Sequence, residues 1–310
     1  MILFADDEPA PPALRDAAIA LGSFDGVHKG HQAVVAAARA TANERGASLG
    51  ASVFEPHPRQ VFRPDDPPFR IQSPGQRARA LAALGVDTVF QIKFDRDLAG
   101  LTDADFAKTI LHDRIGASHV VVGFDFQFGR GRMGDAASLT RLGQMLGFTV
   151  SVVEAVSDVA GPKISSSAIR QAISEGRVDD AHDLLGRPWA IEGLVGPGFA
   201  RGRTIGFPTA NVGLGAYVRP RYGVYAVTAA LDDGTRVPGV ANCGVKPTVG
   251  GATEPLLEAH LFDFDGDLYG RRIEVEFVRF LRPEQKFENF DALKAQIATD
   301  AAQARALLSA

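Results

Sequence analysis

Two histidines lie in a glycine-rich string that joins a short apolar run to an alanine-rich, helix-like segment. The string reads Gly-Ser-Phe-Asp-Gly-Val-His-Lys-Gly-His from position 22 to 31. A helix that starts after a strand offers unpaired backbone amides to an anion such as phosphate. Gly26 and Gly30 let the backbone approach a ligand, and the two histidines, three residues apart, can together donate hydrogen bonds to phosphate oxygens. The string therefore predicts a phosphate-binding loop, whose candidate residues are Gly22, Phe24, Asp25, Gly26, His28, Gly30 and His31.

A plain surface turn and a metal site both fit this string less well. A lone His-x-x-His is most simply a pair of surface histidines in a turn, but the full string at a strand-to-helix junction favours function. A metal site would need further ligands, and the neighbouring sequence holds no cysteine or histidine cluster that completes a coordination shell.

Two later strings carry groups that suit a nucleotide. Residues 122–132 place an aspartate among three phenylalanines and two arginines after another strand candidate, so they should reach the same edge of a sheet. Alternating phenylalanines are equally consistent with core packing. Residues 164–170 put three serines at an expected helix start with an arginine one turn later, although such serines also serve as ordinary helix caps. The candidate residues from these two strings are Asp125, Ser165, Ser166, Ser167 and Arg170.

A basic loop and a carboxylate mark a second candidate site in the C-terminal half. Residues 201–211 read Arg-Gly-Arg-Thr-Ile-Gly-Phe-Pro-Thr-Ala-Asn, which would otherwise be an ordinary hairpin loop. Thr209 and Asn211 are separated by one residue, so in extended backbone both can face one hard cation that bridges ATP oxygens. Glu258 lies on an alternating strand pattern and could take a proton from an alcohol during phosphoryl transfer, although an isolated glutamate there is more often solvated. The candidate residues of the loop are Arg201, Arg203, Gly206, Pro208, Thr209 and Asn211.

The elements that must position these residues follow two patterns. From Ala17 to about Glu154, short apolar runs alternate with amphipathic segments, which indicates a parallel sheet covered by helices. Beyond Gly186, strands punctuated by glycine and proline indicate a small antiparallel barrel. We therefore expect an α/β protein with a Rossmann-like domain at residues 1–186 and a β-barrel domain with a C-terminal helix at residues 187–310. The expected strands are Ala18–Phe24, Ser48–Phe54, Thr88–Ile92, His119–Val122, Phe148–Val153, Gly223–Ala230, Arg236–Asn242 and Arg272–Phe280, and the expected helices are Gln32–Glu44, Ser73–Leu84, Asp103–Ile115, Ala136–Leu146, Ser165–Glu175, Val178–Leu185 and Phe290–Leu308.

Composition and charge narrow the class of protein. The chain of 310 residues has the length of two domains, and 45% apolar with 23% charged residues is ordinary for a globular protein. Its net charge of -4 gives no attraction to phosphate backbones or anionic membranes, so neither a nucleic acid nor a membrane is expected as a partner. The one cysteine, Cys243, and a start without a basic stretch and an apolar run favour the cytoplasm. We expect a monomer or a weak homo-oligomer.

Together, the three N-terminal strings resemble the nucleotidyltransferases marked by His-x-Gly-His and a downstream serine-rich loop. Specifically, they resemble the FMN adenylyltransferase module of bacterial bifunctional riboflavin kinase/FAD synthetases, and the match covers roughly Ala17 to Leu185. The resemblance implies that the FMN phosphate attacks the α-phosphorus of ATP and that pyrophosphate leaves. It implies that His28 and His31 stabilise the transferring phosphates, that Arg170 and the serines hold the pyrophosphate, and that the 122–132 aspartate contacts nucleotide or flavin.

The C-terminal strings resemble the riboflavin kinase module of the same enzymes. The matching strings lie at residues 206–211, 242–251, 258–260, 265–270 and 280–287. The resemblance implies that Thr209 and Asn211 bind Mg-ATP and that Glu258 is the general base on the riboflavin 5'-hydroxyl. Mg²⁺ would serve both steps, with ATP as co-substrate, riboflavin as first substrate, FMN as intermediate and FAD as product.

Three rival functions compete with this hypothesis. An adenylyltransferase for another small phosphorylated acceptor would share the N-terminal strings, but the kinase-like loop at 201–211 argues against it. A flavin-sensing protein without turnover would share both folds, yet His28, His31 and Glu258 are all retained. A nucleic-acid-binding role is weaker still, because no basic and aromatic stripe accompanies the acidic balance.

Overall fold

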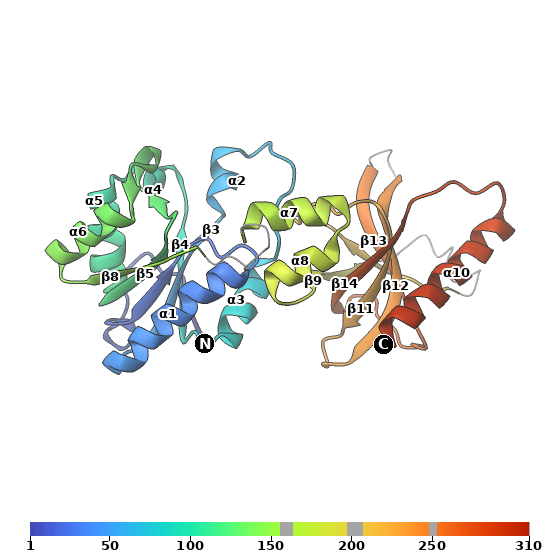
Figure 1. The fold of residues 1–310 in the computed structure, drawn as a ribbon, viewed down its shortest axis with the longest axis horizontal. Helices are drawn as coiled ribbons and strands as arrows, with labels where there is room; N and C mark the ends of the chain where they lie inside the picture. Colours follow the sequence, from blue (N-terminus) through green and yellow to red (C-terminus); the bar gives the residue numbers. More distant parts are fainter. Residues whose placement is uncertain (156–163, 197–206, 248–252, 310) are drawn as a thin grey trace. The chain divides into compact units, whose positions relative to one another are not determined.

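The chain divides into two compact units in a computed structural model, which describes residues 1–155, 164–196, 207–247 and 253–309 (Figure 1). The first unit comprises Met1–Pro67 and Pro74–Ser165, and the second comprises Pro68–Ser73 and Ser166–Ala310. The expected combination of a Rossmann-like α/β fold and an antiparallel barrel with a C-terminal helix is confirmed.

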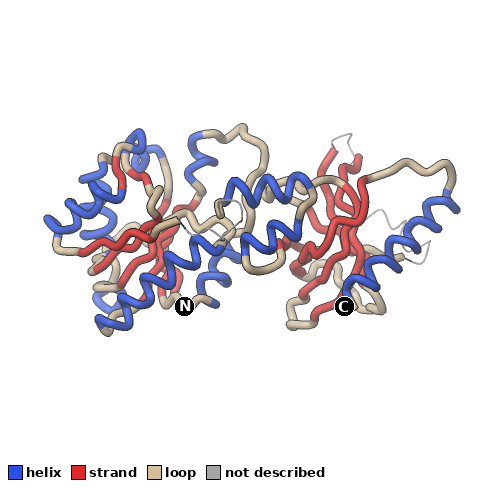
Figure 2. The backbone as a smooth tube through the Cα atoms, viewed as in Figure 1, coloured by secondary structure: helices blue, strands red, loops and turns tan. Residues whose placement is uncertain are grey.

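The first unit is a parallel sheet covered by helices (Figure 2). Within the described residues, the sheet has six strands in the order β1–β4–β3–β2–β5–β8, and neighbouring strands run parallel. Its strands are β1 (Ile2–Phe4), β2 (Ala18–Leu21), β3 (Leu49–Glu55), β4 (Thr88–Lys93), β5 (His119–Gly123) and β8 (Thr149–Val153). The surrounding elements are η1 (Pro12–Leu14), α1 (Lys29–Arg45), α2 (Pro58–Phe62), α3 (Pro74–Ala83), α4 (Arg96–Gly100), α5 (Asp103–Asp105), the π-helix η2 (Phe106–Ile115), the ribbon β6 (Gln127–Phe128) and β7 (Gly134–Asp135), η3 (Arg130–Arg132) and α6 (Ala136–Leu146).

Apolar side chains cover both faces of this sheet. Ile19 of β2 packs in a cluster with Phe106 of η2, whereas the adjacent Ala20 packs in a second cluster with Val35 of α1. A strand that is buried on both faces is apolar at every position, which explains the run Ala-Ile-Ala-Leu of β2.

The strand order reverses at β2, which lies between β3 and β5. In open α/β sheets, the loops at the carboxyl ends of the strands beside such a switch point form the crevice where ligands bind. β2 ends at Leu21, and the histidine-containing string begins there. The expectation that this strand would reach Phe24 was wrong, because Phe24 has a left-handed backbone with φ of 51°, which a strand does not accommodate.

The second unit is a β-barrel with helices beside it. Within the described ranges, the barrel closes in the order β10–β13–β12–β11–β14–β9, with antiparallel pairs throughout. Trp189, Tyr225 and Phe277 are fully buried, and the Phe277 ring contacts both of the other rings. The elements are α7 (Ser166–Glu175), α8 (Val178–Leu185), β9 (Trp189–Gly196), β10 (Ala210–Gly213), β11 (Gly223–Ala230), β12 (Arg236–Pro247), β13 (Thr253–Leu261), β14 (Arg272–Pro283) and α10 (Phe290–Leu308).

A short segment from the first half of the sequence, Pro68–Ser73, folds with the barrel. The indole Nε1 of Trp189 donates to the Ile71 carbonyl at 2.8 Å, and Arg187 donates to the side chain of Gln72 at 2.9 Å. The backbone of Arg70 pairs with the segment around Tyr217. The segment thereby becomes part of the second unit.

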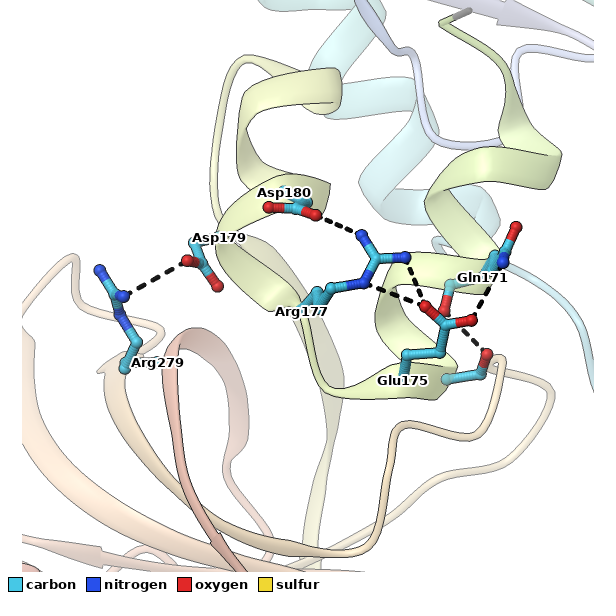
Figure 3. Close-up of polar contacts among 7 residues, drawn as sticks. Gln171, Glu175, Arg177, Asp179, Asp180 and Arg279 are labelled. Carbon is cyan, nitrogen blue, oxygen red and sulfur yellow. Dashed lines mark hydrogen bonds and ion pairs between the residues drawn. The ribbon is translucent and has the colours of Figure 1, made fainter. Parts of the chain in front are cut away.

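The turn between α7 and α8 carries a group of ion pairs (Figure 3). Arg177 contacts the carboxylates of Glu175 and Asp180, and Asp179 of α8 pairs with Arg279 of β14 at 3.3 Å. These contacts attach the helical hairpin to the barrel. Within the described ranges, no helix combines the length and the apolar character that crossing a membrane requires.

Candidate active sites

His28 closes the loop after β2 and caps the first turn of α1. Its Nδ1 accepts a hydrogen bond from the backbone N–H of His31 at 3.3 Å, and the residue is buried. A ring nitrogen that accepts carries no proton, so the neutral ring of His28 carries its proton on Nε2. The two imidazole rings stack with their centroids 3.7 Å apart. The first turn of α1 therefore combines an imidazole N–H donor with the positive end of a helix dipole, which suits a phosphate group.

The backbone of this loop is strained and closely fitted. Val27, a β-branched residue, adopts a φ of 41°, and Gly26 adopts a φ of 94°. Strain of this kind clusters at functional sites, where the surrounding structure holds it in place. A Cβ on Gly30 would lie 3.2 Å from two atoms of the His28 ring, and one on Gly22 would lie 3.4 Å from the Phe24 ring. Gly30 therefore leaves room for the His28 ring, whereas a side chain at Gly22 would make an ordinary contact with Phe24. Asp25, in the same loop, is 3% exposed.

An arginine that the sequence analysis missed supports the loop from α3. Arg77 is buried, and its Nη2 lies 3.0 Å from Oε2 of Glu55 at the end of β3. Its Nη1 also donates to the carbonyl of Ser23 in the histidine loop at 3.4 Å. Arg77 thus links the carboxyl ends of two neighbouring strands. In the sequence, Arg77 is one arginine in an amphipathic helix, and nothing there indicates that it links two strand ends.

Asp125 follows β5, the neighbour of β2, and it is exposed at the same edge of the sheet. The phenylalanines around it have divided roles. Phe128 is buried in the core and stacks with Phe126 at 5.5 Å between ring centroids, whereas Phe124 is exposed. Core packing therefore accounts for two of the three rings in this string.

The serine string and Arg170 belong largely to the second unit. Ser165 ends the first unit, and Ser166 and Ser167 begin α7. One turn later, the Nε of Arg170 donates to the Phe69 carbonyl at 2.7 Å, and the guanidinium lies 5.4 Å from the centre of the Phe69 ring. The Pro68–Ser73 segment therefore fixes the orientation of Arg170.

One cross-strand row of the barrel collects the polar groups of the second candidate site. Asn211 of β10 lies directly opposite Glu258 of β13, and Glu258 lies directly opposite Asn242 of β12. Residues that are directly opposite in antiparallel strands project from the same face. The register therefore places an amide on each side of the Glu258 carboxylate. Asn242 is a second residue that the sequence analysis did not select.

Asn211 is the buried member of this row. It is 5% exposed, and its Nδ2 donates to the Thr209 carbonyl at 3.2 Å. Among the described residues, its Oδ1 has no hydrogen-bond partner. A buried amide oxygen without a partner loses the free energy of hydration, so it is a ready ligand for a cation or a donor.

A cavity of about 310 Å³ opens beside Asn211. Its lining includes Pro208, Thr209, Asn211, Asp265, Asp267 and Tyr269. Amide, hydroxyl and carboxylate oxygens are the ligands that Mg²⁺ accepts, so the donor set fits this ion. Within the described part of the chain, no group of three or more His, Cys, Asp or Glu side chains could hold a metal. Mg²⁺ here would need most of its remaining ligands from substrate phosphates and water.

His260 holds the loop at the mouth of this cavity. Its Nδ1 lies 2.9 Å from the Pro208 carbonyl, and because a carbonyl oxygen only accepts, Nδ1 carries the proton. This bond fixes the backbone next to Thr209. In the Glu-x-His string, Glu258 is therefore the candidate base, and His260 supports the backbone that leads into the neighbouring strand β10.

Comparison with known proteins matches both halves of the chain. The FAD synthetase family model matches residues 10–168, and the riboflavin kinase family model matches residues 185–308. The bifunctional riboflavin kinase/FMN adenylyltransferase of Pseudomonas fluorescens is 44% identical over 296 residues, 96% of this chain and 94% of that protein. The protein of the same name from Escherichia coli K12 is 42% identical, over 93% of this chain and 91% of its own length.

The chain belongs to the bifunctional riboflavin kinase/FMN adenylyltransferase family. A crystal structure described as a macrolide-efflux protein from Streptococcus pneumoniae has the same two-domain fold, with 33% identity, a TM-score of 0.87, and coverage of 98% of this chain and 99% of that one. The family membership agrees with the resemblance that the sequence strings indicated.

The structure groups the family's motif residues as follows. In the first unit, it brings His28 and His31 together with the loop residues Gly22 to Gly30, and it places Asp125 at the same sheet edge. In the second unit, it brings Asn211 opposite Glu258, and the Asn211 side chain donates a hydrogen bond to the Thr209 carbonyl. The loop residues Arg201, Arg203 and Gly206 lie outside the described residues.

Proposed function

We propose that this chain phosphorylates riboflavin to FMN in the barrel and adenylylates FMN to FAD in the α/β domain, consuming ATP in both steps. The observation that carries the proposal is that each unit brings together residues suited to phosphate transfer. They are His28 with His31 at the start of α1, and Asn211 with Glu258 on the barrel. We assign the adenylyltransferase to residues 1–186 and the kinase to residues 187–310.

In the kinase step, Glu258 takes the proton of the riboflavin 5'-hydroxyl as the hydroxyl oxygen attacks the γ-phosphorus, and ADP leaves. Thr209 and Asn211 would hold Mg²⁺, which supplies charge neutralisation on the ATP phosphates. The Oδ1 of Asn211, which has no hydrogen-bond partner in the described part of the chain, supports this assignment. The basic loop with Arg201, Arg203, Gly206 and Pro208 is assigned to the phosphates.

In the adenylyl-transfer step, a phosphate oxygen of FMN attacks the α-phosphorus of ATP, and pyrophosphate leaves. The protein supplies no nucleophile, so its residues position the reactants and stabilise developing charge. His28 and His31 donate to the transferring phosphates. Arg170 with Ser165, Ser166 and Ser167 binds the leaving pyrophosphate. Asp125 is assigned to the bound nucleotide or flavin.

The wider setting follows from charge and composition. We infer an enzyme of the cytoplasm that needs no nucleic acid or membrane partner and works as a monomer or a weak homo-oligomer. The net charge of -4 and the one cysteine support this inference.

The test is to incubate the purified protein with riboflavin, ATP and Mg²⁺ and to follow the flavins by chromatography. We expect FMN to appear first and FAD afterwards, and both to depend on Mg²⁺. If neither riboflavin nor supplied FMN is converted, an adenylyltransferase for another phosphorylated acceptor or a flavin-sensing protein becomes the better assignment.

A further inference from the structure

The barrel face that carries Glu258 continues along β12 from Asn242 to Gly244. These two residues are separated by one position, so they share a face, and Asn242 is the partner of Glu258. The space above Gly244 is occupied: a Cβ built there would lie 2.0 Å from Oε1 of Glu284. The Glu284 carboxylate therefore lies over this face, about 7 Å along the strand from the Asn242–Glu258 pair.

The backbone before Glu284 is firmly held. Arg282, at the end of β14, forms a two-pronged ion pair with Asp300 of α10, with N–O distances of 2.9 and 2.8 Å, and Asp300 is 3% exposed. The Nη1 of Arg282 also donates to the Pro283 carbonyl at 2.9 Å. A rigid support of this kind lowers the entropy cost of placing the next side chain in one position.

The carboxylate itself is available to a ligand. Glu284 is exposed, and within the described residues it accepts no hydrogen bond and forms no ion pair. Its face also carries, on the far side of Glu258, the buried Oδ1 of Asn211, which has no hydrogen-bond partner among the residues that the structure describes. An acceptor at one end, a base in the middle and an amide at the other end together outline an elongated polar subsite.

We propose that Glu284 is a substrate-binding residue of the kinase site, whose carboxylate accepts hydrogen bonds from the secondary hydroxyls of the acceptor's polyol chain. The proposal rests on the proposed function. With the terminal hydroxyl at Glu258, the rest of a polyol extends along β12 towards Gly244. Hydroxyl donors that leave water need acceptors, and a carboxylate is a strong one. A side chain at position 244 would occupy the space that the Glu284 carboxylate fills.

Two variants test the role of Glu284, and each has a matched control. Glu284→Gln removes the charge, and Gly244→Ala displaces the same carboxylate without removing it. The controls are Glu288→Gln, an exposed glutamate in the same segment, and Gly213→Ala, where an added Cβ meets nothing within 4 Å. Riboflavin and ATP kinetics, riboflavin binding by flavin fluorescence, and FAD formation from supplied FMN are measured for all four.

We expect both test variants to raise the KM and the Kd for riboflavin about 10-fold or more, the effect of losing a charge-assisted hydrogen bond. The KM for ATP, the Mg²⁺ requirement and FAD formation from FMN stay as in the wild type, as do all parameters of the controls. Unchanged riboflavin binding, or a shift in the ATP or Mg²⁺ dependence instead, overturns the proposal. A wild-type protein that neither binds nor phosphorylates riboflavin would contradict the proposed function itself.

Discussion

At the scale of single residues, the loop that carries His28 and His31 depends on the absence of a side chain at Gly30. A Cβ there would lie 3.2 Å from Cε1 and Nδ1 of His28. We expect Gly30→Ala to shift the His28 ring from its cap and to lower kcat for FAD formation about tenfold, or about 1.4 kcal/mol. The melting temperature should change little, because the helix preference of alanine offsets the weakened cap.

The control for this substitution is Gly100→Ala on α4, where an added Cβ meets nothing within 4 Å. Stopped assays of FAD formation and thermal unfolding of both variants separate catalysis from stability. Equal rates for Gly30→Ala and the wild type would mean that His28 does not need its present orientation.

Cys243 gives a second prediction at this scale. The thiol is fully buried between Asn242 and Gly244, and burial raises its pKa to about 12. Since the thiolate is the reactive form, the folded protein should not react with a thiol reagent at pH 8. In denaturant, where the pKa returns to about 8.5, one equivalent should react rapidly. Rapid labelling of the folded protein would show that the barrel opens at β12.

Functional residues that are close together in the sequence are easier to predict than residues that meet only in the fold. His28 and His31 belong to one local motif, so their grouping follows from their spacing. Arg77 lies 22 positions from Glu55, and its role arises only when α3 packs against the ends of two strands. Nothing in the helix distinguishes Arg77 from an exposed arginine.

At the scale of elements, two ion pairs attach α10 to the barrel and differ in burial. The side chains of Arg282 and Asp300 are 19% and 5% exposed, whereas those of Arg305 and Asp263 are 47% and 79% exposed. We expect Asp300→Ala to lower the free energy of unfolding by about 3 kcal/mol, because a largely buried guanidinium loses its partner. Asp263→Ala should cost less than about 1 kcal/mol, since exposed pairs contribute little.

Denaturant unfolding of the two variants measures this difference. Asp300→Ala should also weaken riboflavin phosphorylation, because Arg282 supports the backbone that leads to Glu284. Equal losses of stability in the two variants would contradict the ranking by burial.

Elements with a strong local pattern were predictable, and elements that depend on distant contacts were not. The expected helix from Ser73 to Leu84 is α3, within two residues at either end. The expected helix from Asp103 to Ile115 continues as a π-helix after Asp105, a change of winding that apolar spacing does not encode. β1 (Ile2–Phe4) was missed because a strand of three residues at an edge carries too little pattern.

At the scale of the whole molecule, the two compact units are not two continuous halves of the sequence. The Pro68–Ser73 segment comes from the first half of the sequence but folds with the barrel. Its anchors are the Trp189 indole, the Arg187 side chain and the Arg170 side chain, all more than 100 positions away. Contacts over such separations leave no periodic pattern, so local sequence could not have predicted them.

The assignment of each activity to its own constellation gives the last prediction. His28→Ala should abolish FAD formation and leave riboflavin phosphorylation intact, and Glu258→Ala should do the reverse when FMN is supplied. Arg170→Met tests the assignment more severely. Arg170 folds in the same unit as the barrel, yet it is assigned to the pyrophosphate that leaves in the adenylyl-transfer step. We expect it to lower FAD formation by at least tenfold, the loss of a charge-assisted contact in the transition state, while the kinase rate stays unchanged. Chromatography of the flavins with separate riboflavin and FMN supplies measures both rates in one protein, and circular dichroism confirms folding. Loss of both activities in a folded His28→Ala or Glu258→Ala protein would mean that the two sites do not work independently.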